Sequence, residues 1–390
     1  MTSVEKSDQS GRAGQAGPPA AFAAALRLGE PQAHGSLAVV PLSFWSDRGA
    51  RYETLSAALR AGTFHVTEVS DGGSVPALRV INEGATGVLM LDGEELVGAK
   101  QNRVLNAAVF VREKSSMVVP VSCVEAGRWH YSGHEFHDEE FVVHAQVRRA
   151  VHESVSLNLR AAGGHRSDQG RVWDEVACLQ SCADSPSPTG AHRDVYAQRS
   201  GDIAGYLDAF PLQSGQHGLL VLRDGEVVGL DFVSRAACYA QLHAKLLRSY
   251  AFDAVTRVMS RGRAAAHGGG GVKGQGGTGE QKGKEGEKAA KGEGVGLRPD
   301  AALARAQAFL EIIARLPGRS FKSPGRGWDV RYAGGGVSGS TLMVRGVAVH
   351  GAFFAAEDGQ GGGEFVNADA QAEQRMVGSD RRRAYLEGRF

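Results

Sequence analysis

Residues 87–123 read GVLMLDGEELVGAKQNRVLNAAVFVREKSSMVVPVSC, and this stretch decides the predicted fold. It contains three apolar runs rich in Val, which are separated by charged residues and turn residues: Gly87–Leu91, Val104–Val111 and Ser116–Cys123. Short β-branched runs bounded in this way are typical of strands. Asp92 and Gly93 form a hairpin-type turn after the first run. Because no helical spacing lies between the runs, the stretch predicts antiparallel sheet.

The rest of the chain adds strands on both sides of this stretch and helices mainly after it. Alternating or apolar runs predict strands over Leu37–Pro41, Thr63–Val69, Leu78–Asn82, Gly218–Phe232 (two strands around Asp224-Gly225), Asp329–Ala333 and Thr341–Phe354. Helical spacing predicts helices over Thr54–Arg60, Phe141–Leu159, Arg171–Gln180, Ser234–Met259 and Pro299–Leu316. The predicted fold class is therefore α+β: a β-rich single domain of mostly antiparallel strands packed against several helices.

Three segments lack the apolar residues that a folded core requires. Residues 1–25 are mostly Gly, Ala, Ser and Gln, and residues 261–296 are a Gly/Lys/Glu-rich insertion with almost no apolar side chain larger than Ala. Such segments cannot bury enough surface to offset their conformational entropy. We predict that 1–25 and 261–296 are disordered and that the 357–390 tail is loose. One domain then comprises 26–260 and 297–356.

Composition and charge exclude several classes of partner. The formal net charge is +1, so no basic field predicts a nucleic-acid partner. No run approaches the roughly 18 apolar residues of a membrane helix, so no membrane partner is expected. Four cysteines in 390 residues favour a reducing compartment. The expected location is cytoplasmic, with organellar targeting left open.

Charged and amide side chains gather between two of the apolar runs. Residues 91–106 read LDGEELVGAKQNRVLN, and strand alternation places Glu94 and Glu95 on opposite sides. A carboxylate held near Lys100 could serve as an acid–base pair or form a mutual salt bridge. A polar hairpin in water is the alternative interpretation of this stretch.

A second polar stretch follows the third apolar run, in VPVSCVEAGRWHY at 119–131. A cysteine at a strand end near Arg128 could be a nucleophile with a lowered pKa. Only Val124–Gly127 separate Cys123 from Arg128, which is one residue too few for a phosphatase loop, and no helix clearly follows. We therefore predict that Cys123 is a buried structural cysteine.

The two polar stretches resemble a known family. LDGEELVGAKQNRVLN and PVSCVEAGRWHY are similar to the ARG and Rhodanese-Phosphatase-superfamily-associated Protein domain, where ARG stands for ADP-ribosylglycohydrolase. The resemblance extends from about Leu28 through VGLDF (Val228–Phe232) and Leu246–Val255 to VRGVAVHGAFF near the C-terminal end. It implies an association with ADP-ribose and NAD-derivative metabolism, with a nucleotide-like small molecule as the partner.

The resemblance also implies a set of site residues. The implied catalytic residues are Glu94, Glu95 and Lys100, and the implied ligand-binding residues are Gln101, Asn102, Arg103, Asn106, Glu125, Arg128 and Trp129. Lysine and arginine side chains could contact phosphate oxygens, the tryptophan could stack on a base, and a glutamate could bind ribose hydroxyls or act as a base.

Histidine and cysteine patterns give weaker signals for a metal. His130, His134, His137 and His144 lie among the acidic residues 138–140, but no tight motif such as H-E-x-x-H is present, and the segment reads as a polar loop that enters a helix. Cys178 and Cys182 stand four residues apart on a predicted helix, as two metal ligands or as two small buried residues. We expect no metal and no cofactor.

Three functions therefore remain open at the level of sequence. The first is an enzyme or ligand-binding protein for an ADP-ribose- or NAD-derived nucleotide. The second is a non-catalytic interaction or scaffold protein, in which the polar residues form a salt-bridged hairpin. The third is a metal-dependent hydrolase that uses the His130–His144 cluster. The sequence does not set the oligomeric state.

Overall fold

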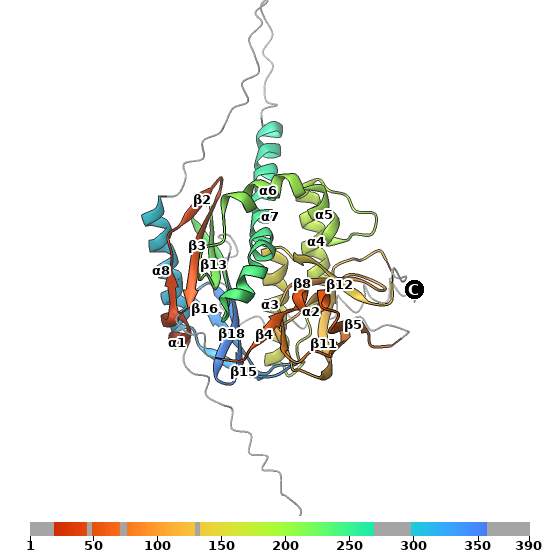
Figure 1. Cartoon of the computed structure of the whole chain (residues 1–390). Helices are drawn as coiled ribbons and strands as arrows, with labels where there is room; N and C mark the ends of the chain where they lie inside the picture. The colour runs from red at the N-terminus through yellow and green to blue at the C-terminus, as the bar shows by residue number, and fades with distance from the viewer. Residues whose placement is uncertain (1–18, 45–48, 71–75, 129–132, 269–297, 357–390) are drawn as a thin grey trace, which may run out of the picture.

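A computed structural model of the chain describes residues 19–44, 49–70, 76–128, 133–268 and 298–356. The described residues form three β-sheets and eight helices, and the strands are mostly antiparallel (Figure 1). The predicted α+β class is confirmed. Among these residues, no helix combines the length and the apolar character needed to cross a membrane.

The largest sheet has nine strands in the order β1-β3-β13-β14-β18-β17-β16-β15, with β2 also paired to β3. Strands from both sides of residues 269–297 join it, because β14 pairs with β18. Its strands are β1 (Leu26–Leu28), β2 (Gln32–His34), β3 (Leu37–Phe44), β13 (Gly218–Arg223), β14 (Glu226–Val233), β15 (Gly318–Lys322), β16 (Trp328–Gly334), β17 (Val337–Val344) and β18 (Val347–Ala355).

Helices cover both faces of this sheet (Figure 1). Val40 and Leu42 pack toward α1 (Pro19–Ala25) and α8 (Pro299–Arg315), whereas Leu37 and Val39 face the core that contains α7 (Ala236–Gly268). This division follows from strand alternation in an apolar run that is buried on both sides.

Both predicted disordered segments extend too far into ordered structure. The prediction for 1–25 is wrong at its end, because Pro19–Ala25 forms α1 and the Phe22 ring packs against Phe232 and Phe353. The prediction for 261–296 is wrong at its start, because α7 continues to Gly268. Residues 269–297 and 357–390 lie outside the described residues.

Two smaller sheets enclose a further core, separate from the two on the faces of the large sheet. A three-stranded sheet has the order β10-β7-β4, and a six-stranded sheet has the order β12-β8-β9-β11-β6-β5. Their inward side chains form one apolar cluster with α2 (Leu55–Arg60). The strands are β4 (Tyr52–Thr54), β5 (Phe64–Glu68), β6 (Ala77–Asn82), β7 (Gly87–Met90), β8 (Glu94–Gly98), β9 (Arg103–Leu105), β10 (Val109–Val111), β11 (Ser115–Cys123) and β12 (Phe136–Val142).

Four further helices lie between β12 and β13. They are α3 (Ala145–Arg160), α4 (Gln169–Ala183), α5 (His192–Gln198) and α6 (Ser200–Ala209). Valines of α3 and α4 pack on Val104 and Val124, at the ends of the strands that carry the polar stretches. The sequence predicts α3 and α4 but not α5 or α6.

Three local predictions are wrong in detail. The Asp92-Gly93 turn does not close a hairpin, because β7 and β8 belong to different sheets. The run Val104–Val111 is broken at Asn106, whose side chain hydrogen-bonds to Ser122 and to the His165 carbonyl. Phe141 belongs to β12 rather than to a helix, so the predicted polar loop before α3 is a strand.

Candidate functional site

The three acidic side chains of the Asp92-Gly-Glu-Glu turn enter three different buried networks. The Asp92 carboxylate faces α3 and the large sheet, Glu94 faces Lys245, and Glu95 faces His192. The predicted opposite orientation of Glu94 and Glu95 is thus confirmed by their partners. Gly93 has a φ of 82°, and a Cβ there would lie 2.6 Å from the Arg148 Cγ. The glycine therefore allows the turn to pack directly on α3.

The Asp92 network centres on a buried guanidinium. Arg148 on α3 donates two hydrogen bonds to Asp231, at 2.8 and 2.6 Å, and its Nη2 lies 3.4 Å from Asp92 Oδ2. The Tyr250 hydroxyl donates to Asp231 at 2.8 Å. The His350 Nδ1 lies 3.6 Å from Asp92 Oδ1. Burial alone would lower the pKa of Arg148, but the two carboxylates outweigh it and raise that pKa.

The large sheet supplies Asp231 and His350 to this network, and with Asp329 and Arg331 they form two adjacent rows of ionisable side chains. One row across β14, β18, β17 and β16 places His350 and Asp329 on the same face, separated by Leu342. The next row places Asp231 and Arg331 on that face, separated by Ala352 and Ser340. The register therefore builds a polar floor from strands that are otherwise apolar.

We call this set the inner polar cluster. Besides Arg148, α3 contributes His152, and the 161–168 segment contributes His165, whose Nε2 lies 2.9 Å from Asp329 Oδ2. The Arg331 guanidinium donates to the same carboxylate at 2.8 Å, and the pKa of Asp329 is held at about 2 because the charge of Arg331 and the hydrogen bond from His165 outweigh burial. The members are Asp92, Arg148, His152, His165, Asp231, Tyr250, Asp329, Arg331 and His350.

Several polar atoms of the cluster are buried without a hydrogen bond. They are Asp92 Oδ1, Arg148 Nε, Arg331 Nη1 and both ring nitrogens of His152 and His350. Each such atom costs about 1–3 kcal/mol, so native proteins retain few of them outside sites that bind or react. The concentration of these atoms here marks the cluster as the candidate functional site.

The protonation of His152 predicts a specific pH dependence. Burial, reinforced by Arg331, lowers the pKa of His152 from 6.5 to about 3. As the pH falls, His152 is protonated near pH 6.5 in the unfolded chain but only near pH 3 in the folded chain. The free energy of unfolding is therefore unaffected by this group above pH 6.5 and decreases as the pH drops toward 3. Between about pH 7 and about pH 5.5, His152 should lower the free energy of unfolding by about 1 kcal/mol. In urea unfolding, the loss of stability over this pH range should be about 1 kcal/mol smaller in His152→Leu than in the wild type, because the buried His144 and His350 still contribute to it in the variant.

His137→Leu provides the matched control, because His137 is exposed on β12. It should keep the wild-type dependence on pH. Equal losses of stability in the wild type and His152→Leu would show that His152 does not titrate as described.

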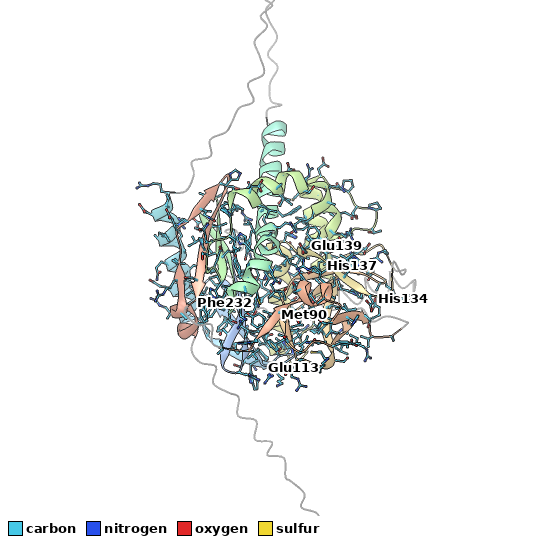
Figure 2. The ribbon with its side chains drawn as sticks, in the orientation of Figure 1. Met90, Glu113, His134, His137, Glu139 and Phe232 are labelled. Carbon is cyan, nitrogen blue, oxygen red and sulfur yellow. The ribbon has the colours of Figure 1, made fainter. Side chains whose placement is uncertain are left out.

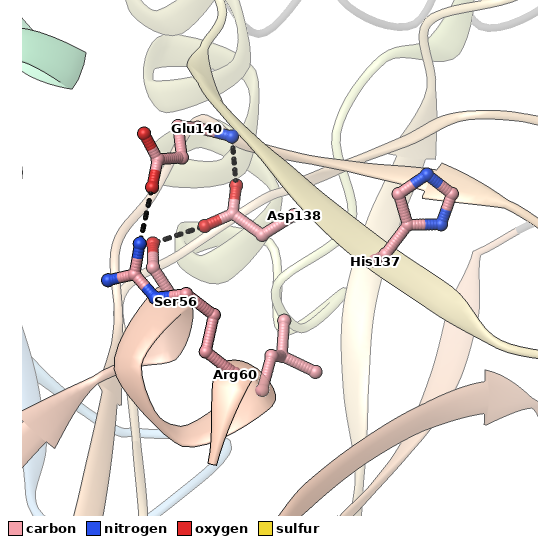
Figure 3. Close-up of a pocket in the computed structure, with 6 residues that line it drawn as sticks. Ser56, Arg60, His137, Asp138 and Glu140 are labelled. Atoms are coloured by element: carbon pink, nitrogen blue, oxygen red, sulfur yellow. Dashed lines mark hydrogen bonds and ion pairs between the residues drawn. The ribbon is translucent and has the colours of Figure 1, made fainter. Parts of the chain in front are cut away.

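The Glu94 network is an ion triad, and one of its members, Asp138, also lines a pocket (Figure 3). Lys245 on α7 lies 2.7 Å from Glu94 and 2.8 Å from both carboxylate oxygens of Asp138. The Ser56 hydroxyl also donates to Asp138, and the Glu140 amide donates at 2.9 Å. Both Asp138 oxygens are therefore occupied. The adjoining pocket measures about 190 Å³, too small to enclose a nucleotide, since ligand pockets span about 300–1,000 Å³.

The Glu95 network is a buried chain through two histidines. Glu95 Oε2 lies 2.9 Å from His192 Nδ1, and His192 Nε2 lies 3.3 Å from His144 Nδ1. The two imidazole rings are stacked. Burial, followed by the neighbouring His192, holds the pKa of His144 well below 6.5. The chain ties β8 to the first residues of α3 and α5.

Most of the other predicted site residues form hydrogen bonds and ion pairs with one another. Arg103 Nη1 donates to Gln101 at 2.8 Å and to the Cys123 sulfur at 2.7 Å. Arg128 holds Glu125 at 2.7 and 2.9 Å and Asn102 at 3.0 Å. Lys100 is half-buried after β8, and Trp129 lies outside the described residues. These contacts brace the ends of β8, β9 and β11.

Cys123 is buried, as the sequence predicts. Burial raises the pKa of its thiol to about 11, although Arg103 opposes the shift. At neutral pH the thiolate is therefore scarce, which argues against a nucleophilic role.

The histidines near β12 do not gather around one point. His137 is exposed and lies 3.4 Å from Glu139, whereas His144 is buried against His192. Figure 2 places His134, His137 and Glu139 on the same side of the molecule, far from Phe232 in the large sheet. Within the described residues, no group of three or more His, Cys, Asp or Glu could hold a metal ion, and His130 lies outside those residues.

Sequence reasoning missed most of the inner polar cluster. Asp231 and His350 lie inside VGLDF and VAVHGAFF, which read as ordinary buried strands. A usable signal was present, because a single ionisable side chain in an apolar strand is costly to bury and requires a partner. The signal for Arg148 was weaker, because it adjoins Arg149 in a helix with many charged residues.

Comparison with known proteins gives one match. A family model described as the ARG and Rhodanese-Phosphatase-superfamily-associated Protein domain matches residues 25–354. No curated protein and no solved structure matches the chain. The matched range includes every member of the inner polar cluster.

Proposed function

The chain belongs to the ARG and Rhodanese-Phosphatase-superfamily-associated Protein domain family, and on that premise we propose that it binds or acts on an ADP-ribose- or NAD-derived nucleotide at the inner polar cluster. The observation that carries the proposal is the set of buried Asp, His and Arg atoms without hydrogen bonds on one face of the large sheet.

The chemistry of the cluster fits that ligand class. The guanidinium groups of Arg148 and Arg331 each keep a donor atom without a hydrogen bond, and guanidinium is well suited to phosphate oxygens. Asp92 keeps an acceptor oxygen that could bind a ribose hydroxyl. Burial lowers the pKa of His350, so this imidazole is neutral near pH 7 and can accept a proton. Together these groups cover the phosphate, sugar and acid–base requirements.

Ligand entry requires a local movement. Asp231 and His350 are at most 1% exposed, whereas the His165 side chain is 9% exposed and lies at the edge of the cluster. His165 belongs to the 161–168 segment between α3 and α4, where a Cβ added at Gly164 would meet nothing within 4 Å. We propose that a ligand enters past His165 when this segment moves.

A second candidate function is a non-catalytic interaction protein. It is favoured by the mutual pairing of Gln101, Arg103 and Cys123 and of Asn102, Glu125 and Arg128. On this interpretation the polar residues of 91–128 only brace the fold. The two functions differ in whether the inner polar cluster accepts a small molecule.

Thermal unfolding with and without ligand tests the proposal. ADP-ribose or NAD at millimolar concentration should raise the unfolding temperature. At 100 times Kd, the ligand adds about 2.7 kcal/mol to the free energy of unfolding. His350→Asn should lose this shift, whereas the surface variant His137→Asn should retain it. If no ADP-ribose-like nucleotide shifts the wild type, the proposal fails. A shift that His350→Asn retains would place the ligand elsewhere.

A further inference from the structure

Helix α4 presents two thiols on its outer side. Val172, Val176, Leu179 and Ala183 are its buried residues, while Cys178 is exposed and Cys182 is half-buried. Cys182 stands four residues after Cys178 on the helix, and burial together with this neighbouring thiol raises the pKa of Cys178. The other cysteines, Cys123 and Cys238, are buried. Among the described residues, the accessible thiols are therefore concentrated in this one pair.

The spacing of this pair favours a bridging ion over a disulfide. Residues four apart on a helix have Cβ atoms about 5–6 Å apart. A disulfide requires about 3.5–4.5 Å between Cβ atoms, so its formation would distort the helix. An ion with two bonds to sulfur of about 2.3 Å each can span the wider gap. Soft ions prefer such thiolate ligands.

We propose that Cys178 and Cys182 form a two-thiolate site for a thiophilic ion, of the class that includes monovalent copper and trivalent arsenic. Each thiol releases its proton, and two sulfur–ion bonds form. Two-thiolate coordination requires no third ligand from the chain. The site is independent of the inner polar cluster.

Phenylarsine oxide tests the site, because this trivalent arsenical condenses with two thiols to form two As–S bonds and one water. The reduced full-length protein should take up one equivalent, detected by intact mass. Tryptic cleavage after Arg171 and Arg193 yields a peptide that holds Cys178 and Cys182 but neither buried cysteine. The adduct should map to that peptide. It should remain after incubation with excess glutathione and be removed by a small dithiol. Monovalent copper, titrated against a competing chelator, forms the second arm.

Matched variants decide the outcome. Cys178→Ser and Cys182→Ser should each abolish the glutathione-resistant adduct, whereas Cys238→Ser removes one thiol and should keep it. Retention of arsenical or copper at one equivalent, dependent on both cysteines, supports the site and identifies its ion. The proposal is overturned if the adduct maps to another peptide, survives in Cys178→Ser, or is displaced by glutathione while copper is also not retained.

Discussion

Arg148→Met is expected to lower the free energy of unfolding by about 3–5 kcal/mol, as for other broken buried ion pairs. The substitution removes the guanidinium that binds both Asp231 oxygens and faces Asp92. Asp231 is fully buried, so among the described side chains only the Tyr250 hydroxyl would still donate a hydrogen bond to its carboxylate. Chemical denaturation monitored by tryptophan fluorescence measures the loss directly.

The neighbouring arginine is a matched control. Arg149 lies on the same helix and pairs with Glu153 at 2.8 Å, but both side chains remain partly exposed. Arg149→Met should therefore cost no more than about 1 kcal/mol. Similar losses for the two variants would mean that the inner polar cluster does not hold α3 to the large sheet.

Lys245→Met should also cost about 3–5 kcal/mol, through a different network. It leaves Glu94 and Asp138 without the ammonium that contacts both, and Glu94 is fully buried. The exposed Lys114 is the control, and Lys114→Met should remain within about 0.5 kcal/mol of the wild type. Adding Glu94→Gln to Lys245→Met should recover at least about 1 kcal/mol relative to the sum of the single effects.

The sign of the pH effect distinguishes this mechanism from a simple packing loss. Burial already raises the pKa of Glu94 even with Lys245 present, and removal of the ammonium should raise it further. The folded variant then binds a proton at a higher pH than the unfolded chain, so its deficit should shrink as the pH falls. A deficit that is constant between about pH 7.5 and about pH 5.5 would indicate lost packing alone.

Turn residues and helix-start residues correctly predicted the elements that depend only on neighbouring sequence. The Asp224-Gly225 hairpin joins β13 and β14 as expected, and α8 begins at Pro299 as expected. Helix α5 escaped prediction, because it is seven residues long with few apolar side chains. The α1 segment escaped because its Ala-rich composition is typical of disorder, and only tertiary contacts of Phe22 fix it.

The candidate site was predictable only in part, for a related reason. Alternation in β8 assigned opposite directions to Glu94 and Glu95, but their partners Lys245 and His192 lie 151 and 97 residues away in sequence. Asp231 and Arg331 become neighbours only through the strand order of the large sheet. The predicted catalytic role of Lys100 and the predicted roles of Gln101 and Arg103 in ligand binding remain predictions.

An experimental structure of the protein with ADP-ribose would show whether the inner polar cluster is the ligand site. We predict that the ligand lies in the inner polar cluster, with a phosphate oxygen at hydrogen-bond distance from Arg148 Nε or Arg331 Nη1. The 161–168 segment should be displaced from its contact between His165 and Asp329. A ligand bound outside the cluster, for example beside Ser56 and Asp138, would contradict the account.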